Sequence, residues 1–378
     1  MKRIFLLEYI WSGHNVGYFH MLAQLFRNAG CEVIAIIPDE ATVASINNSG
    51  DTGYKALLHK VEIKSKYLWQ NWPSLTKVCR EAEQKYGKPN LVFFPYLDNL
   101  LFPTAQRFPW VKQKWFEQLF PYKWGGLYFH PGYQPFPASE QMLGYRNCAG
   151  VGVLNPLDIE RIKKDLPSAK LIPFPDFANL EVEEGQSSFI DDLKAKAKGR
   201  PIVASLGVQA RRKGIITFLD MAQLPGAESF YFFAAGELRD GTLEKYEVNR
   251  VAALAASPPD NLWVYAQKIA SEGLYNRILQ EADIVFVGYQ NFPSSSNTLT
   301  KAAYFNTPIL ASEAGYIGWA TRTYNLGITF NAFDPAAGLA ALNRLSDAEI
   351  TNEGQDKFLQ INSHKAAHQF IDQLLSSV

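Results

Sequence analysis

Two stretches in the second half of the chain carry residues that could hold a phosphate group. In the first, an apolar run ends at Gly207 and three cations follow, Arg211, Arg212 and Lys213. In the second, small polar residues precede a helical pattern: Ser294, Ser295, Ser296, Asn297 and Thr298. Cations at the carboxyl end of a strand neutralise phosphate charge, and the free N–H groups at a helix start bind it. The two stretches therefore predict a diphosphate site, with a solvated basic loop and an ordinary helix cap as the alternatives.

The first half has a histidine at the end of an expected strand. His130 follows residues 126–129, and open α/β sheets bind ligands at the carboxyl ends of their strands. We expect His130 to lie in a ligand site, and a buried structural histidine is the alternative. His14, Asp98 and Asn99 are further candidates for the wall of that site.

The sequence offers no obvious ligands for a metal ion. It contains no Asp-x-Asp motif and no histidine–carboxylate cluster with metal-ligand spacing. A metal ion that binds a diphosphate is itself held by carboxylates of the protein. We therefore expect no metal and no other cofactor, and expect Lys213 and the helix start to stabilise the diphosphate instead.

Alternating strands and helices must position these residues. Apolar runs predict strands at residues 3–9, 31–37, 91–94, 126–129 and 151–154, and again at 202–206, 229–234, 262–265, 284–287 and 309–311. Helical spacing lies between many of them. This order predicts an α/β fold of two Rossmann-like, doubly wound parallel-sheet domains facing across a cleft. We expect domains at residues 1–172 and 173–355, and a C-terminal helix, 356–378, that packs back on the N-terminal domain.

Composition limits the partners of the protein. The 378 residues include 37 Lys and Arg and 37 Asp and Glu, and this zero net charge gives no global case for a nucleic-acid partner. The three scattered cysteines suit a reducing compartment. No run of about 18 apolar residues occurs, so we expect a soluble, cytoplasmic protein.

Aromatic residues make up 13% of the chain. Within residues 108–124, lysines alternate with large rings: Lys112, Lys114 and Lys123 with Trp110, Trp115, Phe116, Phe120 and Trp124. One interpretation is a packed aromatic core with a solvated lysine face. The other is a patch that contacts a sugar acceptor, or makes weak peripheral contact with the inner face of a membrane.

The turn after the first expected strand excludes one common ligand. Residues 12–17 read Ser-Gly-His-Asn-Val-Gly, which lacks the G-x-G-x-x-G spacing of a dinucleotide site. Over most of its length the sequence instead resembles the retaining glycosyltransferase family 4, which has the GT-B fold. Residues 207–214 resemble the family pattern G-R-L-x-x-x-K-G, with Lys213 and Gly214 in place. Residues 299–315 resemble the pattern L-L-E-A-x-x-x-G-x-P-V-I-A-S-D-x-G.

The resemblance implies a role for individual residues. His130 and Lys213 become the catalytic residues. The donor nucleotide sugar would be bound by Gly13, Gly207, Arg211, Arg212, Glu237, Tyr265, Gln267, Lys268, Ser294, Ser295, Ser296, Asn297, Thr298 and Lys301. His130 would face the donor sugar, and His14, Asp98 and Asn99 would lie on the acceptor side.

The sequence departs from the family at several positions. The arginine of the first pattern falls on Val208, so Arg211 or Arg212 would have to substitute for it, and a G-F-G stretch is replaced by residues 294–296. The family's pair of glutamates, which contact the donor sugar and the nucleotide ribose, falls on Pro293 and Lys301, and neither side chain accepts a hydrogen bond from a hydroxyl.

The resemblance predicts a metal-independent hexosyltransferase. It would move a hexose from UDP-glucose or a similar nucleotide sugar to a glycan or lipid-linked acceptor, with retention, in polysaccharide biosynthesis. A GT-B sugar-nucleotide epimerase and a non-catalytic protein that binds nucleotide sugars or glycans remain the alternatives.

Overall fold

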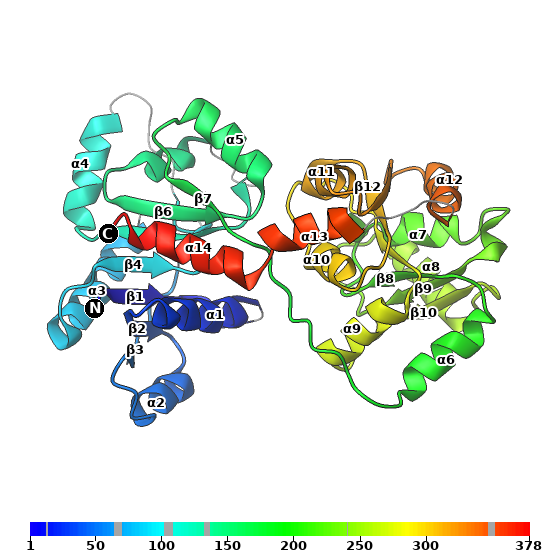
Figure 1. Cartoon of the computed structure of the whole chain (residues 1–378), viewed down its shortest axis with the longest axis horizontal. Coiled ribbons are helices and arrows are strands. Elements are labelled where there is room, and N and C mark those ends of the chain that lie inside the picture. Colours follow the sequence, from blue (N-terminus) through cyan, green and yellow to red (C-terminus); the bar gives the residue numbers. More distant parts are fainter. Residues whose placement is uncertain (13, 64–69, 102–108, 132–136, 240, 347–351) are drawn as a thin grey trace. The chain divides into compact units, whose positions relative to one another are not determined.

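A computed structural model describes the whole chain except residues 13, 64–69, 102–108, 132–136, 240 and 347–351 (Figure 1). The chain divides into two compact units, each with its own parallel sheet. Unit 1 comprises Met1–Pro175 and His364–Val378, and unit 2 comprises Asp176–Ser363. The expected boundaries were 172/173 and 355/356.

Unit 1 is built on a seven-stranded sheet in the order β3-β2-β1-β4-β5-β6-β7. Its strands are β1 (Arg3–Leu7), β2 (Glu32–Ile37), β3 (Tyr54–Leu58), β4 (Leu91–Phe94), β5 (Trp124–Tyr128), β6 (Cys148–Val153) and β7 (Leu171–Pro173). Its helices are α1 (His14–Asn28), α2 (Glu40–Asn48), α3 (Asn71–Tyr86), α4 (Pro109–Leu119), η3 (Pro137–Gly144), α5 (Pro156–Asp165) and α14 (His364–Leu375). Every strand pairing is parallel, because helices cross over between strands.

Unit 2 has a six-stranded parallel sheet in the order β10-β9-β8-β11-β12-β13. Its strands are β8 (Ile202–Leu206), β9 (Tyr231–Ala235), β10 (Leu262–Tyr265), β11 (Ile284–Val287), β12 (Ile309–Ser312) and β13 (Gly327–Phe330). Its helices are α6 (Ser188–Ala197), η4 (Arg211–Lys213), α7 (Ile215–Met221), η5 (Ala227–Ser229), α8 (Lys245–Ala256), α9 (Glu272–Glu281), α10 (Asn297–Tyr304), α11 (Gly315–Thr323), α12 (Pro335–Ser346) and α13 (Asn352–Ile361).

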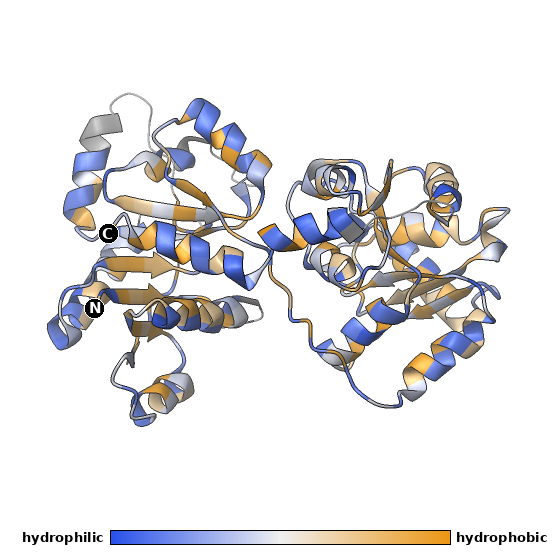
Figure 2. Ribbon diagram, in the orientation of Figure 1, coloured by the Kyte–Doolittle hydropathy of each residue, from blue (hydrophilic) through white to orange (hydrophobic). Residues whose placement is uncertain are grey.

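Both sheets are buried on two faces, as the continuous apolar runs predict. The strands are apolar in Figure 2, whereas most helices carry a hydrophilic outer face. In unit 1, Trp72 of α3 is fully buried, packs edge-on against Phe94 and Trp124, and donates its indole N–H to Leu100 O at 3.0 Å. The predicted α/β architecture of two parallel sheets is therefore confirmed.

The C-terminal segment, expected as one helix, consists of two. α13 belongs to unit 2, where Phe358 packs against Tyr324, and α14 belongs to unit 1. In unit 1 the ring of Phe370 lies edge-on to Phe93 and Phe174, at 6.2 and 4.8 Å between ring centres. α14 therefore covers a face of the first sheet.

Candidate functional site

In each sheet the strand order reverses at one pair of neighbouring strands. The pair is β1 and β4 in unit 1, and β8 and β11 in unit 2. The loops that leave such a pair turn toward opposite faces of the sheet and open a crevice between them, where open α/β sheets bind ligands. The predicted site residues follow these strands or their neighbours.

In unit 2, the loop after β8 brings Lys213 back onto the end of that strand. Gly207 and Gly214 have φ of 88° and 74°, a left-handed conformation that favours glycine. The ammonium Nζ of Lys213 donates to Leu206 O at 3.3 Å. It also lies 2.9 Å from the position that a Cβ on Gly207 would occupy. A side chain at position 207 would therefore displace the ammonium.

Hydroxyl groups from α9 and from the loop after β11 surround Lys213. Its Nζ lies 5.6 Å from the centre of the Tyr289 ring. The Ser296 hydroxyl donates to the Tyr289 hydroxyl at 3.1 Å, and the hydroxyls of Tyr275 and Thr298 are 2.9 Å apart. We call Lys213 with these four side chains the Lys213 cluster. Neither tyrosine was predicted from the sequence, because Tyr289 follows an apolar run and Tyr275 lies within an amphipathic helix, and both positions are typical of core residues.

The pKa of Tyr289 reflects the positive charge of Lys213. Burial by itself raises the pKa of Tyr289, but the Lys213 ammonium and the hydroxyls of Ser296 and Thr298 outweigh it. The pKa of Tyr289 therefore lies below its ordinary value, because the cluster favours an anion. The same groups would stabilise a phosphate oxygen beside them.

The N-terminus of α10 adds to this environment. Ser296 is the residue before the helix, yet its hydroxyl does not cap the helix and bonds to Tyr289 instead. The first N–H groups of a helix attract anions. Ser295 and Asn297 face elsewhere: the Ser295 hydroxyl bonds to the Asp176 carboxylate, and the Asn297 amide donates to Phe177 O at 2.5 Å. Ser294 is buried. The structure thus brings Ser296 and Thr298 to Lys213.

The two predicted arginines have different partners. Arg211 Nη2 lies 2.6 Å from Oε2 of Glu247, whose side chain is buried in α8. Most of its charge is therefore neutralised away from the Lys213 cluster. The guanidinium of Arg212 lies 4.9 Å from the centre of the Phe292 ring, in the loop after β11, and Arg212 is exposed. Arg212 is thus the predicted arginine on the side of that loop.

Lys301, at the position of a family glutamate, is a buried cation with its own partners. Its side chain is 2% exposed, forms an ion pair with Glu272 of α9, and donates to Asn276 Oδ1 at 2.8 Å. Its Nζ also lies 4.5 Å from the centre of the Tyr275 ring. Burial lowers the pKa of Lys301, and Glu272 opposes that shift. Lys301 therefore joins α10 to α9 through its contacts with Glu272 and Asn276.

The remaining donor-side residues follow β9 and β10. Gly236, with φ of 143°, allows the loop after β9 to approach that after β8, because a Cβ there would lie 1.9 Å from Gly207 O. Glu237, Gln267 and Lys268 are exposed, whereas the Tyr265 ring packs edge-on against Phe189 at 5.1 Å. These four residues and the Lys213 cluster all lie at the carboxyl ends of the strands of this sheet.

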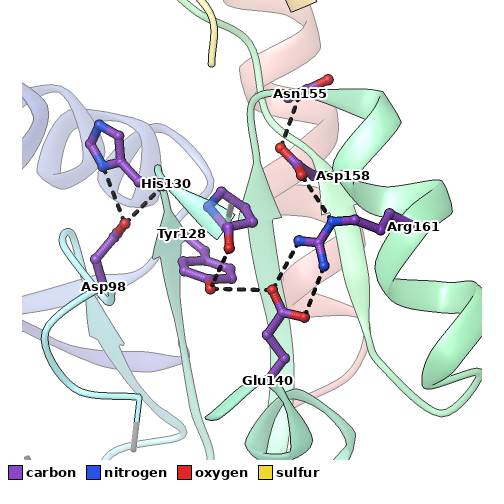
Figure 3. Close-up of polar contacts among 8 residues, drawn as sticks. Asp98, Tyr128, His130, Glu140, Asn155, Asp158 and Arg161 are labelled. Carbon is purple, nitrogen blue, oxygen red and sulfur yellow. Dashed lines mark hydrogen bonds and ion pairs between the residues drawn. The ribbon is translucent and has the colours of Figure 1, made fainter. Parts of the chain in front are cut away.

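In unit 1, Asp98 holds both the backbone and the ring of His130 (Figure 3). Asp98 Oδ1 accepts the His130 N–H at 2.8 Å and lies 3.2 Å from His130 Nδ1, and Oδ2 accepts the Phe129 N–H at 3.0 Å. The carboxylate is 5% exposed and the imidazole 43%. Because a carboxylate accepts hydrogen bonds, this contact puts a ring proton on Nδ1. His130 is therefore an oriented, solvent-accessible histidine and not a buried one.

A second network supports the segment that follows His130 (Figure 3). The Tyr128 hydroxyl lies 3.4 Å from Pro131 O and 3.3 Å from Glu140 Oε1. The Arg161 guanidinium binds both oxygens of Glu140, at 3.0 and 3.2 Å, and its Nε lies 3.3 Å from Asp158. Burial raises the pKa of Tyr128, and the Glu140 carboxylate raises it further. The hydroxyl is therefore a permanent donor in this network.

The other acceptor-side candidates are His14 and Asn99. The side chain of His14 lies outside the described residues, as does Gly13, which was expected on the donor side. Asn99 lines a pocket of about 610 Å³ together with Tyr9 and Ile10. Sequence analysis missed Glu8, which precedes these residues and is fully buried. Its signal was an acidic residue at the end of an apolar run.

The aromatic segment at residues 108–124 is mostly core. Phe116, Phe120 and Trp124 are fully buried, so for these three rings the packed-core interpretation is correct and the surface-patch interpretation is wrong. Trp124 begins the interior strand β5, and every side chain of β5 is covered. Trp115 is 45% exposed, and Lys114 and Lys123 are also exposed. The side chains of Trp110 and Lys112 lie outside the described residues.

The described part of the chain contains neither a candidate metal site nor a helix that could span a membrane. Its histidines, cysteines, aspartates and glutamates form no group of three or more that could hold a metal ion. None of its helices is both long enough and apolar enough to cross a membrane.

Comparison with known proteins identifies the fold. No family model matches the sequence, and no curated protein matches it either. Among solved structures, a sucrose-phosphate synthase from Thermosynechococcus elongatus is 17% identical with a TM-score of 0.66, covering 100% of this chain and 98% of that one. A glycosyltransferase from Rickettsia africae is 12% identical with a TM-score of 0.72, and the match covers 100% of this chain and 98% of that one. Anabaena HepE in complex with UDP is 14% identical with a TM-score of 0.68, covering 100% of both chains.

These likenesses extend over the whole chain and include both sheets. At such low identity they establish the fold and leave the activity open. The predicted GT-B fold class is confirmed, because the strand orders of the two units occur here in a chain that matches these structures from end to end.

Proposed function

We propose that this protein is a metal-independent glycosyltransferase. It moves a hexose from UDP-glucose or a similar UDP-sugar to a glycan or lipid-linked acceptor, with retention, in polysaccharide biosynthesis. The observation that carries the proposal is the Lys213 cluster at the point where the second sheet reverses its strand order. The residue pattern at 207–214 supports membership of the retaining family 4.

The chemistry of a diphosphate leaving group fits this cluster. When the bond from C1 of the sugar to the β-phosphate oxygen breaks, negative charge develops on that oxygen. Lys213, the neighbouring hydroxyls and the N-terminus of α10 would stabilise it, which lowers the barrier. In front-face retention the acceptor oxygen bonds to C1, and the leaving phosphate takes the acceptor proton. That step needs no general base from the protein.

Names of similar structures support the choice of donor. One is an α,α-trehalose-phosphate synthase described as UDP-forming, and a second structure of HepE holds UDP and glucose. His130 is the group that we assign to the sugar, because Asp98 orients its ring and leaves it 43% exposed. We assign the protein to the cytoplasm, with the acceptor at or near the inner face of the membrane.

Lys213→Ala tests the phosphate assignment. We expect UDP affinity to fall by about 10- to 100-fold, since a hydrogen bond to a charged group contributes roughly 1.5–3 kcal/mol. Lys245→Ala is the matched control, because Lys245 is an exposed lysine of α8 in the same unit. Calorimetry with UDP, run with EDTA and with magnesium, gives the affinities. Equal affinities of the two variants would overturn the assignment, and binding only with magnesium would overturn metal independence.

Product analysis then tests turnover. UDP-glucose labelled in the sugar is incubated with the protein and with candidate acceptors. A labelled glycan or lipid-linked sugar supports the transferase, an altered sugar still attached to UDP supports the epimerase, and bound but unchanged donor supports a non-catalytic protein. The anomeric configuration of the product tests retention.

A further inference from the structure

Glu8 is a buried carboxyl group at the point where the first sheet reverses its strand order. It directly follows β1, which lies beside β4. Its side chain is fully buried, and Oε1 accepts the N–H groups of Tyr9 at 2.8 Å and Ile10 at 2.9 Å. Within the described chain, Oε2 has no hydrogen-bond partner and no cation pairs with the group. A buried carboxyl without a cation is uncharged, because burying the charge costs far more than adding a proton.

The surroundings of Glu8 keep it uncharged. Burial raises the pKa of Glu8 to about 8, although the two backbone N–H groups act to lower it. The titratable groups near it are Tyr9 on its own loop, Tyr96 and Asp98 after β4, and His59 after β3. His59 is also uncharged: its Nδ1 accepts the Val61 N–H at 3.1 Å, and its Nε2 donates to Glu8 O at 2.8 Å.

The residues that Glu8 holds are walls of the 610 Å³ pocket. Tyr9 and Ile10 follow β1, Pro38 follows β2, residues 59–63 follow β3, and Asn99 follows β4. Glu8 binds the first two through its side chain and His59 through its carbonyl. Glu8 thus contacts two walls of the pocket: its carboxyl group holds the Tyr9–Ile10 turn, and its backbone carbonyl holds His59.

The lining indicates the chemical class of the ligand. Ile10, Pro38, Val61 and Ile63 are apolar, Tyr9 adds an aromatic ring, and Asn99 adds an amide. Lys60 and Glu62 carry opposite charges, so the lining has no surplus that would attract an anion. Aromatic and aliphatic walls with a few hydrogen-bonding groups suit a sugar ring, which has apolar faces and hydroxyl edges.

We propose that Glu8 is a positioning residue that holds this pocket in shape for an uncharged sugar, the acceptor of the transfer. The acceptor role rests on the proposed function, whereas the dependence of the pocket on Glu8 does not. When Glu8 loses its proton, a buried negative charge must be resolvated. The Tyr9–Ile10 turn then leaves its position, and the pocket loses its shape.

The first experiment needs no ligand. Protein labelled with ¹⁵N at tyrosine and isoleucine is titrated with alkali, and the amide signals of Tyr9 and Ile10 are followed by NMR. We expect one common midpoint near pH 8 in the native protein and none in Glu8→Gln, which keeps an oxygen for both N–H groups. Glu81→Gln, an exposed carboxylate of α3, is the matched control and should keep the midpoint. A midpoint that survives in Glu8→Gln, or is absent from the native protein, overturns the proposal.

The second experiment tests the ligand with two probes, maltose as the neutral sugar and glucose 6-phosphate as the anion. Maltose should perturb the same amide signals and glucose 6-phosphate should not. Because only the protonated form is competent, maltose affinity should fall about tenfold one pH unit above the midpoint, while hydrolysis of UDP-glucose stays unchanged. Tighter binding of the phosphate, or no perturbation by either probe, overturns the ligand class. Failure of UDP-glucose binding would instead count against the proposed function alone.

Discussion

The backbone N–H of His130 and its ring Nδ1 share one acceptor, Oδ1 of Asp98, at 2.8 and 3.2 Å. One buried carboxylate on the loop after β4 thus fixes the residue that follows β5, across two neighbouring strands of the first sheet. An imidazole held in this way presents its other edge in a defined direction. Such an arrangement favours a residue that contacts substrate over one that only packs.

Asp98→Asn should therefore slow turnover without weakening the binding of UDP. The amide has one oxygen where the carboxylate has two, so the N–H of Phe129 or the His130 ring loses its acceptor. We expect kcat/KM for UDP-glucose to fall about 10- to 100-fold, the effect of losing a charge-assisted hydrogen bond. Steady-state kinetics and UDP calorimetry measure the two effects. Asp98→Asn combined with His130→Ala should be no slower than His130→Ala alone, and additive losses would show that Asp98 acts elsewhere.

Gly207→Ala should damage the Lys213 cluster through the backbone. The left-handed φ of 88° is unfavourable for alanine, and the new Cβ would lie 2.9 Å from Lys213 Nζ. We expect the free energy of unfolding to fall by about 1–3 kcal/mol, together with a loss of UDP affinity. Gly226→Ala is the control, since Gly226 also has a positive φ, 92°, but open space around it. It should lose stability and keep UDP affinity.

Lys301→Glu would restore the residue type that the family has at this position, and we expect it to destabilise the protein. The new carboxylate would replace a buried ammonium that now pairs with Glu272 and donates to Asn276. Because Lys301 is buried but Glu272 is 53% exposed, placing an unpaired carboxylate here costs roughly 1–3 kcal/mol. Lys301→Met should cost less, and Glu272→Lys with Lys301→Glu should recover part of the loss. Urea unfolding measures the stability of all three variants. An unchanged stability of Lys301→Glu would show that the contacts of Lys301 do not stabilise the protein.

Glu8 should make the protein less stable as pH rises. Its pKa is raised to about 8 in the folded protein from 4.5 when unfolded. Between these values the folded state binds more protons than the unfolded state, so stability falls with pH. Each pH unit in this window costs about 1.4 kcal/mol, and the loss is complete above the folded pKa. Urea unfolding from pH 5 to 8.5 should show this slope relative to Glu8→Gln, and parallel curves would contradict it.

The exposed part of α4 and the loop after it provides a test of membrane contact. Lys114, Trp115 and Lys123 remain exposed while the neighbouring rings are core. Lys114→Glu with Lys123→Glu should weaken binding to phosphatidylserine vesicles, since each lysine near an anionic surface contributes about 1 kcal/mol. Flotation assays measure the bound fraction. The melting temperature should not change, and equal flotation of native and variant protein would remove the membrane contact from the proposal.

Much of the fold follows from patterns that are local in sequence. Runs such as residues 33–37 and 284–287 are apolar throughout, which indicates strands covered on both faces, and hence parallel sheets with crossing helices. The short strands β3, β7 and β13 were missed, because partly exposed or proline-containing runs lack that signal. The loop of residues 207–214 was also predictable as a cation-bearing turn after a strand, since the glycines, the strand end and Lys213 are neighbours in the chain.

The sequence alone thus predicted two parallel sheets and a cation-bearing loop after one strand of the second sheet. The strand orders and their reversal points appear only in the tertiary structure. Only the tertiary structure decided which charges are available there. Arg211 is neutralised by Glu247, 36 residues away, and Lys301 by Glu272, 29 residues away. Glu8 carries a raised pKa because β1, β3 and β4 bury it together. The charge of a side chain depends on its desolvation and on partners distant in sequence, and these exist only once the sheets have formed.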